Sequence, residues 1–368
     1  MRVPGDRMLP VAGLMLLGTT LAAAENPSIV NGSVQKHAVT TNLSAEVSSL
    51  VKAQASAAWI GYAVPAENPD FESCCSYGDS DARSCGQCRL EEGNYSSDTV
   101  TGKGTVNLES QDLVVMFRAE GGAIGKVRTF SQTCELDAGG RTVYWLTGVN
   151  PRESVDLLRG LVAGHARELE SAGDEDHMSD GAVAAIAEHA GPEADAAMKA
   201  FAAPDQPEKL RERAAFWMGS ARGKAGFDTL RQLARDDRDD RDDRFREKLM
   251  FDLSVSRQPE AVDALIDSAH HDESARVRGQ AIFWLAQKAG KKAVGAITEA
   301  IERDPETEVK KKAVFALSQL PKDEGVPLLI ETVRSNSNPV VRKDAMFWLG
   351  QSNDPRALEF FERVLSSR

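Results

Sequence analysis

The second half of the chain repeats one pattern of apolar and polar positions. In residues 277–287, VRGQAIFWLAQ, the apolar residues Val277, Ala281 and Leu285 recur at the spacing of one helical face. Similar segments begin at residues 210, 245, 309 and 341. Successive copies begin thirty-two residues apart, except that thirty-five residues separate the first two. The pattern predicts five copies of one amphipathic helix.

A second apolar pattern follows each copy and predicts a partner helix. Two columns of apolar residues share one face of these partners: Val262, Val294, Val326 and Leu358 in one, and Leu265, Ile297, Leu329 and Phe361 in the other. A degenerate sixth pair precedes the five, over residues 182–202. One pair cannot bury its apolar face alone, whereas stacked pairs bury a continuous core. We therefore expect six stacked helix pairs over residues 174–368. The degenerate first pair is expected to be a capping repeat, which has no neighbour on one side.

These repeats resemble HEAT-like repeats of the short kind found in phycobilisome-lyase-type proteins. The resemblance rests on Val277-Arg278, Ala281 and Leu285 and on their equivalents in the later copy: Val341-Arg342, Ala345, Leu349 and Gly350. It covers residues 174–368 only. It implies a right-handed α-solenoid whose surface binds a partner protein, and nothing in the chain suggests tetrapyrrole chemistry.

One aromatic position recurs on the side of the first helices that should face away from the core. It is occupied by Phe216, Phe251, Phe283, Phe315 and Phe347. At about 100° per residue, Phe283 lies about 160° from both Ala281 and Leu285. An ordered outward row of rings is an apolar patch of the kind that marks a partner site. Alternatively, adjacent rings cover one another, or the N-terminal domain folds back over them. The tryptophans that follow three of the phenylalanines are expected to pack between repeats.

The segment RDDRDDRDDR, residues 235–244, lies where the interval between repeats is three residues longer. We interpret it as a solvated turn between two helix pairs, lengthened by about one triplet. Aspartate oxygens also suit calcium, but Arg interrupts every Asp pair and the spacing of a calcium loop is missing. A second charged feature is a basic residue directly after the first apolar residue of each copy. These residues are expected to pair with acids of neighbouring turns. They form the basic column: Arg211, Arg246, Arg278, Lys310 and Arg342.

The middle of the chain predicts a small β-rich domain over residues 57–150. Residues 57–66 form its first expected strand, which ends at Pro65. Residues 112–131 and 133–149 look like hairpins that turn at Gly121-Gly122 and Gly139-Gly140. Segments outside the hairpins are also assigned: a further strand at 101–110, a flexible polar leader at 25–56 with a helix near 45–52, and a connecting helix at 151–173.

Residues 1–24 have the pattern of a secretory signal peptide. Arg2 and Arg7 precede an apolar run from Met8 to Leu21, and three alanines end it. The run is short for a membrane span, and a retained anchor is the alternative. We expect an exported chain, periplasmic or extracellular, without an integral membrane span after cleavage.

Export decides how the five cysteines are interpreted. They are Cys74, Cys75, Cys85, Cys88 and Cys134. Outside the cytoplasm structural disulfides are the default, and an odd number leaves at least one thiol over. The CxxC at Cys85 and Cys88 admits a redox pair, but the expected strand and helix around it are missing. A zinc site from four thiolates is the third interpretation.

Composition and missing motifs narrow the function classes. The chain has 368 residues, 42% hydrophobic and 27% charged, with a formal net charge of −12, which argues against a general nucleic-acid binder. Neither a phosphate-binding loop nor a nucleophile elbow is present, and the adjacent His270 and His271 are expected to be polar surface. The expected fold class is α+β multidomain, mainly α, with the cysteine-containing β-rich domain before the solenoid. We expect an exported protein-binding scaffold without a cofactor, metal or catalytic residue. The rivals are a redox or zinc enzyme in the cysteine-rich domain and a purely structural envelope component.

Overall fold

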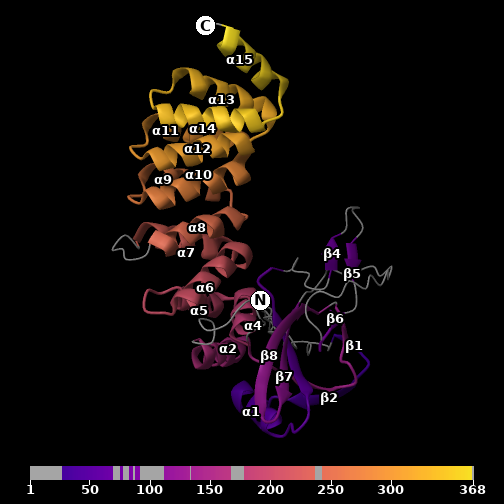
Figure 1. Cartoon of the computed structure of the whole chain (residues 1–368). Coiled ribbons are helices and arrows are strands. Elements are labelled where there is room, and N and C mark those ends of the chain that lie inside the picture. Colours follow the sequence, from indigo (N-terminus) through magenta and orange to yellow (C-terminus); the bar gives the residue numbers. More distant parts are fainter. Residues whose placement is uncertain are drawn as a thin grey trace, which may run out of the picture.

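The computed structural model describes residues 27–68, 75–77, 83–85, 88–91, 112–132, 134–166, 178–236 and 243–366, with the backbone alone at 75–77, 83–85, 88 and 236. The predicted signal peptide and the strand expected at 101–110 lie outside these residues. The described part forms two units, which we call the head, residues 27–166, and the stack, residues 178–366 (Figure 1). None of the described helices is long and apolar enough to cross a membrane.

The centre of the head is a sheet of five strands in the order β2-β10-β3-β7-β8. These strands are β2 (Ser33–Ala38), β3 (Ala58–Pro65), β7 (Asp112–Glu120), β8 (Ala123–Ser131) and β10 (Thr142–Thr147). Strands β7 and β8 form the first predicted hairpin, in which Gly121 and Gly122 take positive φ at the turn. Strand β3 has almost no exposed side chain, because both faces of the sheet are covered.

The second predicted hairpin is wrong. Strand β9 (Glu135–Asp137) pairs in parallel with β1 (Ser28–Val30) and β6 (Cys88–Arg89), while β10 joins the central sheet. Gly139 and Gly140 do turn the chain at positive φ, but the turn leads from one sheet to the other. The reason is burial: Leu136 on one sheet and Trp145 on the other belong to the same apolar cluster, which a hairpin would split.

The polar leader expected at residues 25–56 is instead part of the head. It supplies β1, β2 and helix α1 (Leu43–Lys52), which Asn42 caps at its N-terminus. Leu43, Val47 and Val51 form one buried helical face against the sheet, and the polar residues between them face water. Three buried apolar residues in ten were enough for a helix, because its core is supplied by the rest of the head.

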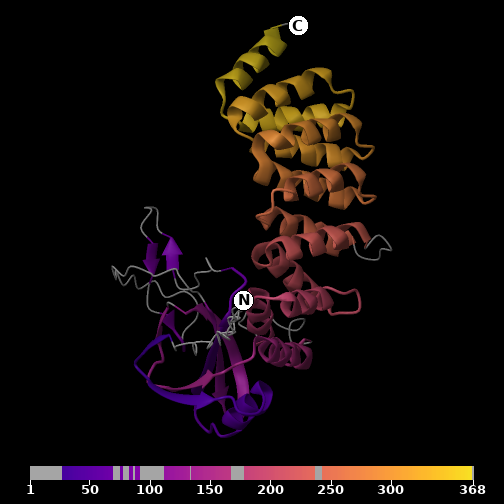
Figure 2. The ribbon, with the colours of Figure 1, turned by 180° about the vertical axis from the view of Figure 1, so that it is seen from behind.

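The stack contains six helix pairs in its described residues, as predicted. The first helices are α4 (Met178–Glu188), α6 (Glu208–Ala221), α8 (Asp243–Val255), α10 (Ala275–Ala289), α12 (Thr307–Gln319) and α14 (Pro339–Gln351). The second helices are α5 (Pro192–Phe201), α7 (Gly223–Asp236), α9 (Ala261–His271), α11 (Val294–Arg303), α13 (Lys322–Ser335) and α15 (Pro355–Ser366). Ala281 and Leu285 of α10 are fully buried, as are their equivalents in α12 and α14. The two layers of helices are visible in Figure 1 and Figure 2.

The first helix pair has a neighbour on the side that was expected to be free. Helix α4 packs against β8 and against α2 (Pro151–His165), and one core joins the head to the stack. The approach is closest at Gly181, where an added Cβ would lie 2.1 Å from the Val127 carbonyl oxygen. The degenerate sequence of this pair therefore reflects its contact with a sheet instead of with another helix pair.

The turns between pairs explain two of the charged features. Helix α7 ends at Asp236 and α8 begins at Asp243, so the RDDRDDRDDR segment joins two repeats, and its central residues 237–242 lie outside the described part. Arg246 and Arg278 of the basic column pair with acids of neighbouring turns, as expected, whereas Lys310 and Arg342 donate to backbone carbonyls. Arg278, for example, donates to both carboxylate oxygens of Asp304, at 2.7 and 3.0 Å, and to the backbone carbonyl of Asp272 at 2.9 Å.

Candidate functional site

The recurring phenylalanines lie on one exposed side of the first helices. Phe216, Phe251, Phe283 and Phe315 are half-buried, and Phe347 at the last pair is 56% exposed. We call these five residues, with Trp217, Trp284 and Trp348, the aromatic row. The wheel geometry accounts for the half-burial, since the rings point away from the core and lean on the flanks of the next helix.

Rings of neighbouring pairs contact one another along the row. Phe216 and Phe251 stack with ring centroids 6.2 Å apart, and Phe283 and Phe315 stack at 6.1 Å and 3° between planes. The expected packing of tryptophans between repeats is present: Trp284 lies 4.8 Å from Phe251, and the equivalent contact recurs one repeat later. The rings thus order one another and still keep part of their surface in water.

Among the described residues, the head makes no extensive contact with the aromatic row. Its main contacts with the stack are to α4 and α5, and neither helix carries a ring of the row. Each phenylalanine ring is therefore partly covered by its neighbours, and the rest of its surface stays accessible.

A glutamine column lies one helical turn beyond the last three phenylalanines. Gln287, Gln319 and Gln351 are all exposed, four residues after Phe283, Phe315 and Phe347 respectively, and therefore on the same side of their helices. A primary amide both donates and accepts hydrogen bonds, as a peptide backbone does. The sequence carried this signal, since three copies of the repeat end in Gln, but a lone exposed glutamine is ordinary surface.

One charged residue interrupts the tryptophan column. Asp252 stands where three other first helices have Trp, and it is only 3% exposed. Burial raises the pKa of its carboxyl to about 8, and the nearby Lys248 partly opposes this shift. Gly219 of the preceding pair makes room for this helix, since an added Cβ there would lie 2.3 Å from the Asp252 carbonyl oxygen.

A buried chain of hydrogen bonds joins the head to the first helix pair. His189 Nδ1 lies 2.6 Å from the carbonyl oxygen of Ala185, so Nδ1 carries the proton and Nε2 is the acceptor in the neutral ring. Ser154 then donates to Nε2 at 2.7 Å and accepts from the Tyr62 hydroxyl at 2.6 Å. Burial lowers the pKa of His189 to about 4, helped by the charge of Arg222 and opposed by the bond to Ala185.

This serine and histidine do not form a catalytic pair. Ser154, His189 and Tyr62 are fully buried, so no substrate reaches them. Arg222 beside them is 1% exposed and donates to the carbonyls of Ala187 and His189, so that a cation caps the C-terminal end of α4. The cluster is a structural joint between head and stack.

Four of the five cysteines lie within the described residues of the head. Backbone pairing sets Cys75 directly opposite Cys85 in the hairpin of β4 (Cys75–Tyr77) and β5 (Arg83–Cys85). Cys88 pairs with Leu136, two residues along from Cys134. Cys134 is buried, lies just before β9 rather than in a strand, and is disulfide-bonded. Cys74 lies outside the described residues.

Other candidate ligands lie apart from one another. His270 Nε2 is 3.7 Å from a Glu299 oxygen, and His271 Nδ1 is 3.1 Å from Asp267, both in ion-pair geometry at a turn. Within the described ranges no three His, Cys, Asp or Glu side chains are grouped so that they could hold a metal ion.

The fold and the row define an α-solenoid with a small β-rich head. Residues 262–345 and 294–368 match the family model of HEAT repeats. HEAT repeats usually mediate protein binding, and this fold suggests a protein-interaction scaffold. No curated protein is detectably similar to the chain.

Solved structures with similar repeats include three proteins of different kinds. Human deoxyhypusine hydroxylase, solved in complex with glycerol, is 17% identical over 58% of this chain and 90% of its own, with a TM-score of 0.30. Kap95p, from a structure on its binding to RanGDP, is 18% identical over 60% of this chain and 33% of its own, with a TM-score of 0.37. The complex of CpcE and CpcF of phycocyanin lyase from Nostoc sp. PCC7120 is 16% identical over 58% of this chain and 80% of its own, with a TM-score of 0.28. Similarity at this level does not indicate what this chain binds.

Proposed function

We propose that this protein is an exported scaffold that binds an extended segment of a partner protein along the aromatic row. The observation that carries the proposal is the row itself: ordered, half-exposed rings at one position of five successive helices. Contiguous apolar surface of this kind marks binding sites on proteins. Export rests on the signal-like pattern of residues 1–24.

The spacing of the row favours an extended occupant. Packed helices lie about 8–10 Å apart. An extended chain rises about 3.3 Å per residue, so about three of its residues span one repeat. An occupant with an apolar side chain at every third residue would therefore place one such side chain against each phenylalanine.

The glutamine column supports the same occupant. An extended segment has unpaired backbone N–H and C=O groups, which cost free energy if they are desolvated without partners. Gln287, Gln319 and Gln351 offer amide donors and acceptors at the repeat spacing beside the rings. Rings then supply apolar contact, and glutamines supply backbone pairing that does not depend on the sequence of the segment.

The test is a selection of displayed random peptides on the folded full chain. Enriched peptides are expected to carry apolar residues with a period of three. Their affinity should fall by about tenfold or more on Phe283→Ser and by a smaller factor on Gln287→Ala. The matched control is Ile266→Ser, which truncates a half-buried apolar residue in the other helix layer and should leave binding unchanged. Helical binders, or equal losses on Phe283→Ser and Ile266→Ser, would refute the proposal.

We further propose that the cysteines form structural disulfides that pin the head. Adjacent antiparallel strands hold opposite Cα atoms about 4.5–5.5 Å apart, within the range a disulfide requires, which favours Cys75–Cys85. With Cys75 and Cys85 paired, Cys88 and Cys74 remain as partners for the disulfide-bonded Cys134, and one thiol is left over. Peptide mapping without reductant tests this pairing. Bound zinc, or a dithiol that cycles between Cys85 and Cys88, would instead support an enzyme in the head.

A further inference from the structure

Two apolar positions of the last helix pair are exposed, although earlier pairs cover them at least in part. Met346 on α14 is 40% exposed, whereas Val314 and Ile282, one and two repeats earlier, are fully buried. Leu365 on α15 is 73% exposed, whereas Ile301, two repeats earlier, is 3% exposed. The interior residues are covered by the following helix pair, and the last pair has no following pair in the described residues.

The exposed apolar side chains are concentrated at this end of the molecule. Among the described residues, every large hydrophobic side chain that is exposed lies on α14 or α15 except Val34 in the head. We call the set on these helices outside the aromatic row the terminal patch: Val340, Met346, Leu358, Val364 and Leu365. The patch lies at the far end of the stack from the head (Figures 1 and 2). Apolar surface gathered in this way indicates an interface.

We propose that the terminal patch binds the terminal patch of a second copy of this chain. The first argument is continuity with the stack, since Met346, Val364 and Leu365 continue columns that the following helix pair covers in earlier repeats. A second copy of the chain presents the same columns and can cover them in the same way. The opposite end of the stack cannot serve, because the head covers α4. A head-to-tail polymer is therefore blocked, and the copies meet tail to tail about a two-fold axis.

The second argument is charge. Glu359 and Arg363 lie four residues apart on α15. If two α15 helices run antiparallel and cross at Phe361, each Glu359 lies opposite the Arg363 of the other copy. A two-fold axis forms both pairs at once, so the surface is complementary to itself.

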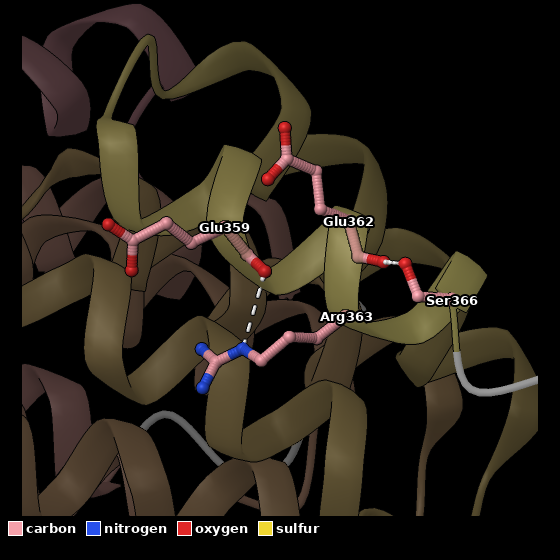
Figure 3. A pocket seen from close by; sticks show the side chains of 4 residues that line it. All are labelled: Glu359, Glu362, Arg363 and Ser366. Atoms are coloured by element: carbon pink, nitrogen blue, oxygen red, sulfur yellow. Dashed lines mark hydrogen bonds between the residues drawn. The ribbon is translucent and has the colours of Figure 1, made fainter.

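These charges are available for a partner. Figure 3 shows that Glu359, Glu362, Arg363 and Ser366 line a pocket on the surface of α15. Arg363 Nε donates to the backbone carbonyl of Glu359 at 3.3 Å, and within the part of the chain that the structure describes no ion pair joins Arg363 to a carboxylate. Exposed pairs at the same spacing elsewhere do close, as Arg303 does with Glu299 at 2.8 Å.

The test is the mass of the folded full chain in solution as a function of concentration, by sedimentation equilibrium. The protein should associate to twice its monomer mass and no further. Leu365→Glu should weaken association by about tenfold or more, because it places a charge in the apolar patch. Val34→Glu is the matched control, since Val34 is 37% exposed in the head, and this substitution should leave association unchanged.

Charge reversal tests the pairing without touching the apolar core. Glu359→Arg alone and Arg363→Glu alone should each weaken association, and the double variant should restore it, because the pairs re-form with signs exchanged. Circular dichroism checks that each variant is folded. A chain that is monomeric at every concentration overturns the proposal, whether residues of the same chain or another protein cover the patch. So does a dimer that Leu365→Glu leaves intact, or a double variant no stronger than the single ones.

Discussion

Arg222 is predicted to be the most costly single side chain to remove at the joint between head and stack. It is 1% exposed and donates to the carbonyls of Ala187 and Gly191, each at 3.2 Å, and to that of His189. Arg222→Met would leave these three α4-end carbonyls without their charged donor, at about 1 kcal/mol each. The ion pair with Asp195, at 2.6 Å, adds at most about 1 kcal/mol because Asp195 is 37% exposed. The expected loss is therefore about 3–4 kcal/mol of unfolding free energy.

The assay is urea unfolding of the full chain followed by far-UV circular dichroism. Arg213→Met is the matched control. Arg213 also pairs with an aspartate, Asp180, at 2.7 Å, but its side chain is 47% exposed, so the expected loss is below about 1 kcal/mol. The reasoning fails if the two variants lose the same free energy, because burial would then not distinguish the joint from the surface.

Three further predictions concern the same joint and the row. The pKa of His189 falls from 6.5 to about 4 on folding. The neutral ring therefore stabilises the protein above pH 6.5, and this contribution should be lost as pH falls through 4. The urea midpoint should fall less steeply across this range for His189→Gln than for the parent protein. Asp252, whose pKa rises from 3.8 to about 8, contributes stability below pH 3.8 that is lost as pH rises through 8, so Asp252→Asn should raise the urea midpoint above pH 8 and have little effect near pH 4. Gly181→Val should lower the melting temperature by several degrees, since its Cβ would meet the Val127 carbonyl oxygen at 2.1 Å, whereas Gly160→Ala, which meets nothing within 4 Å, should not. Equal pH profiles for a variant and the parent protein, or equal melting temperatures for the two glycine variants, would contradict these assignments.

The stack could be predicted from sequence because its information is repeated. Each copy places apolar residues at the same two core positions, Ala or Leu at the first and Leu or Met at the second, so five weak helix signals add up to one strong one. The outward angle of the phenylalanines followed from helix geometry alone. Their stacking distances did not, because they depend on how closely neighbouring pairs approach.

The head could be predicted only in part, because its contacts join residues far apart in the chain. The β7–β8 hairpin is local and was predicted from its glycine turn. Strand β10 instead lies between β2 and β3, partners about one hundred residues earlier, and no periodicity announces such a parallel pairing. The joint was also hidden, since Tyr62, Ser154 and His189 meet only after the sheet and α4 have packed.

The candidate site could be predicted from the sequence only in part. The phenylalanine column could be aligned by eye, but its exposure could not be judged without knowing where the head lies. The terminal patch was invisible, because Met346 and Leu365 continue columns that are core in the earlier repeats. Sequence shows which column a residue occupies, and only the structure shows which columns lack a neighbour.

The most direct test of the central claim is photo-crosslinking of the full-length protein in cells that make it. A photoreactive residue at Gln319, beside Phe315, should crosslink to a partner protein. The same residue at Asp263, which is exposed on α9 in the other helix layer, should not. Crosslinks from Gln319 that map to an extended segment of the partner, and none from Asp263, would support the aromatic row as the binding surface. Crosslinks from Asp263 alone, or equally from both positions, would contradict it.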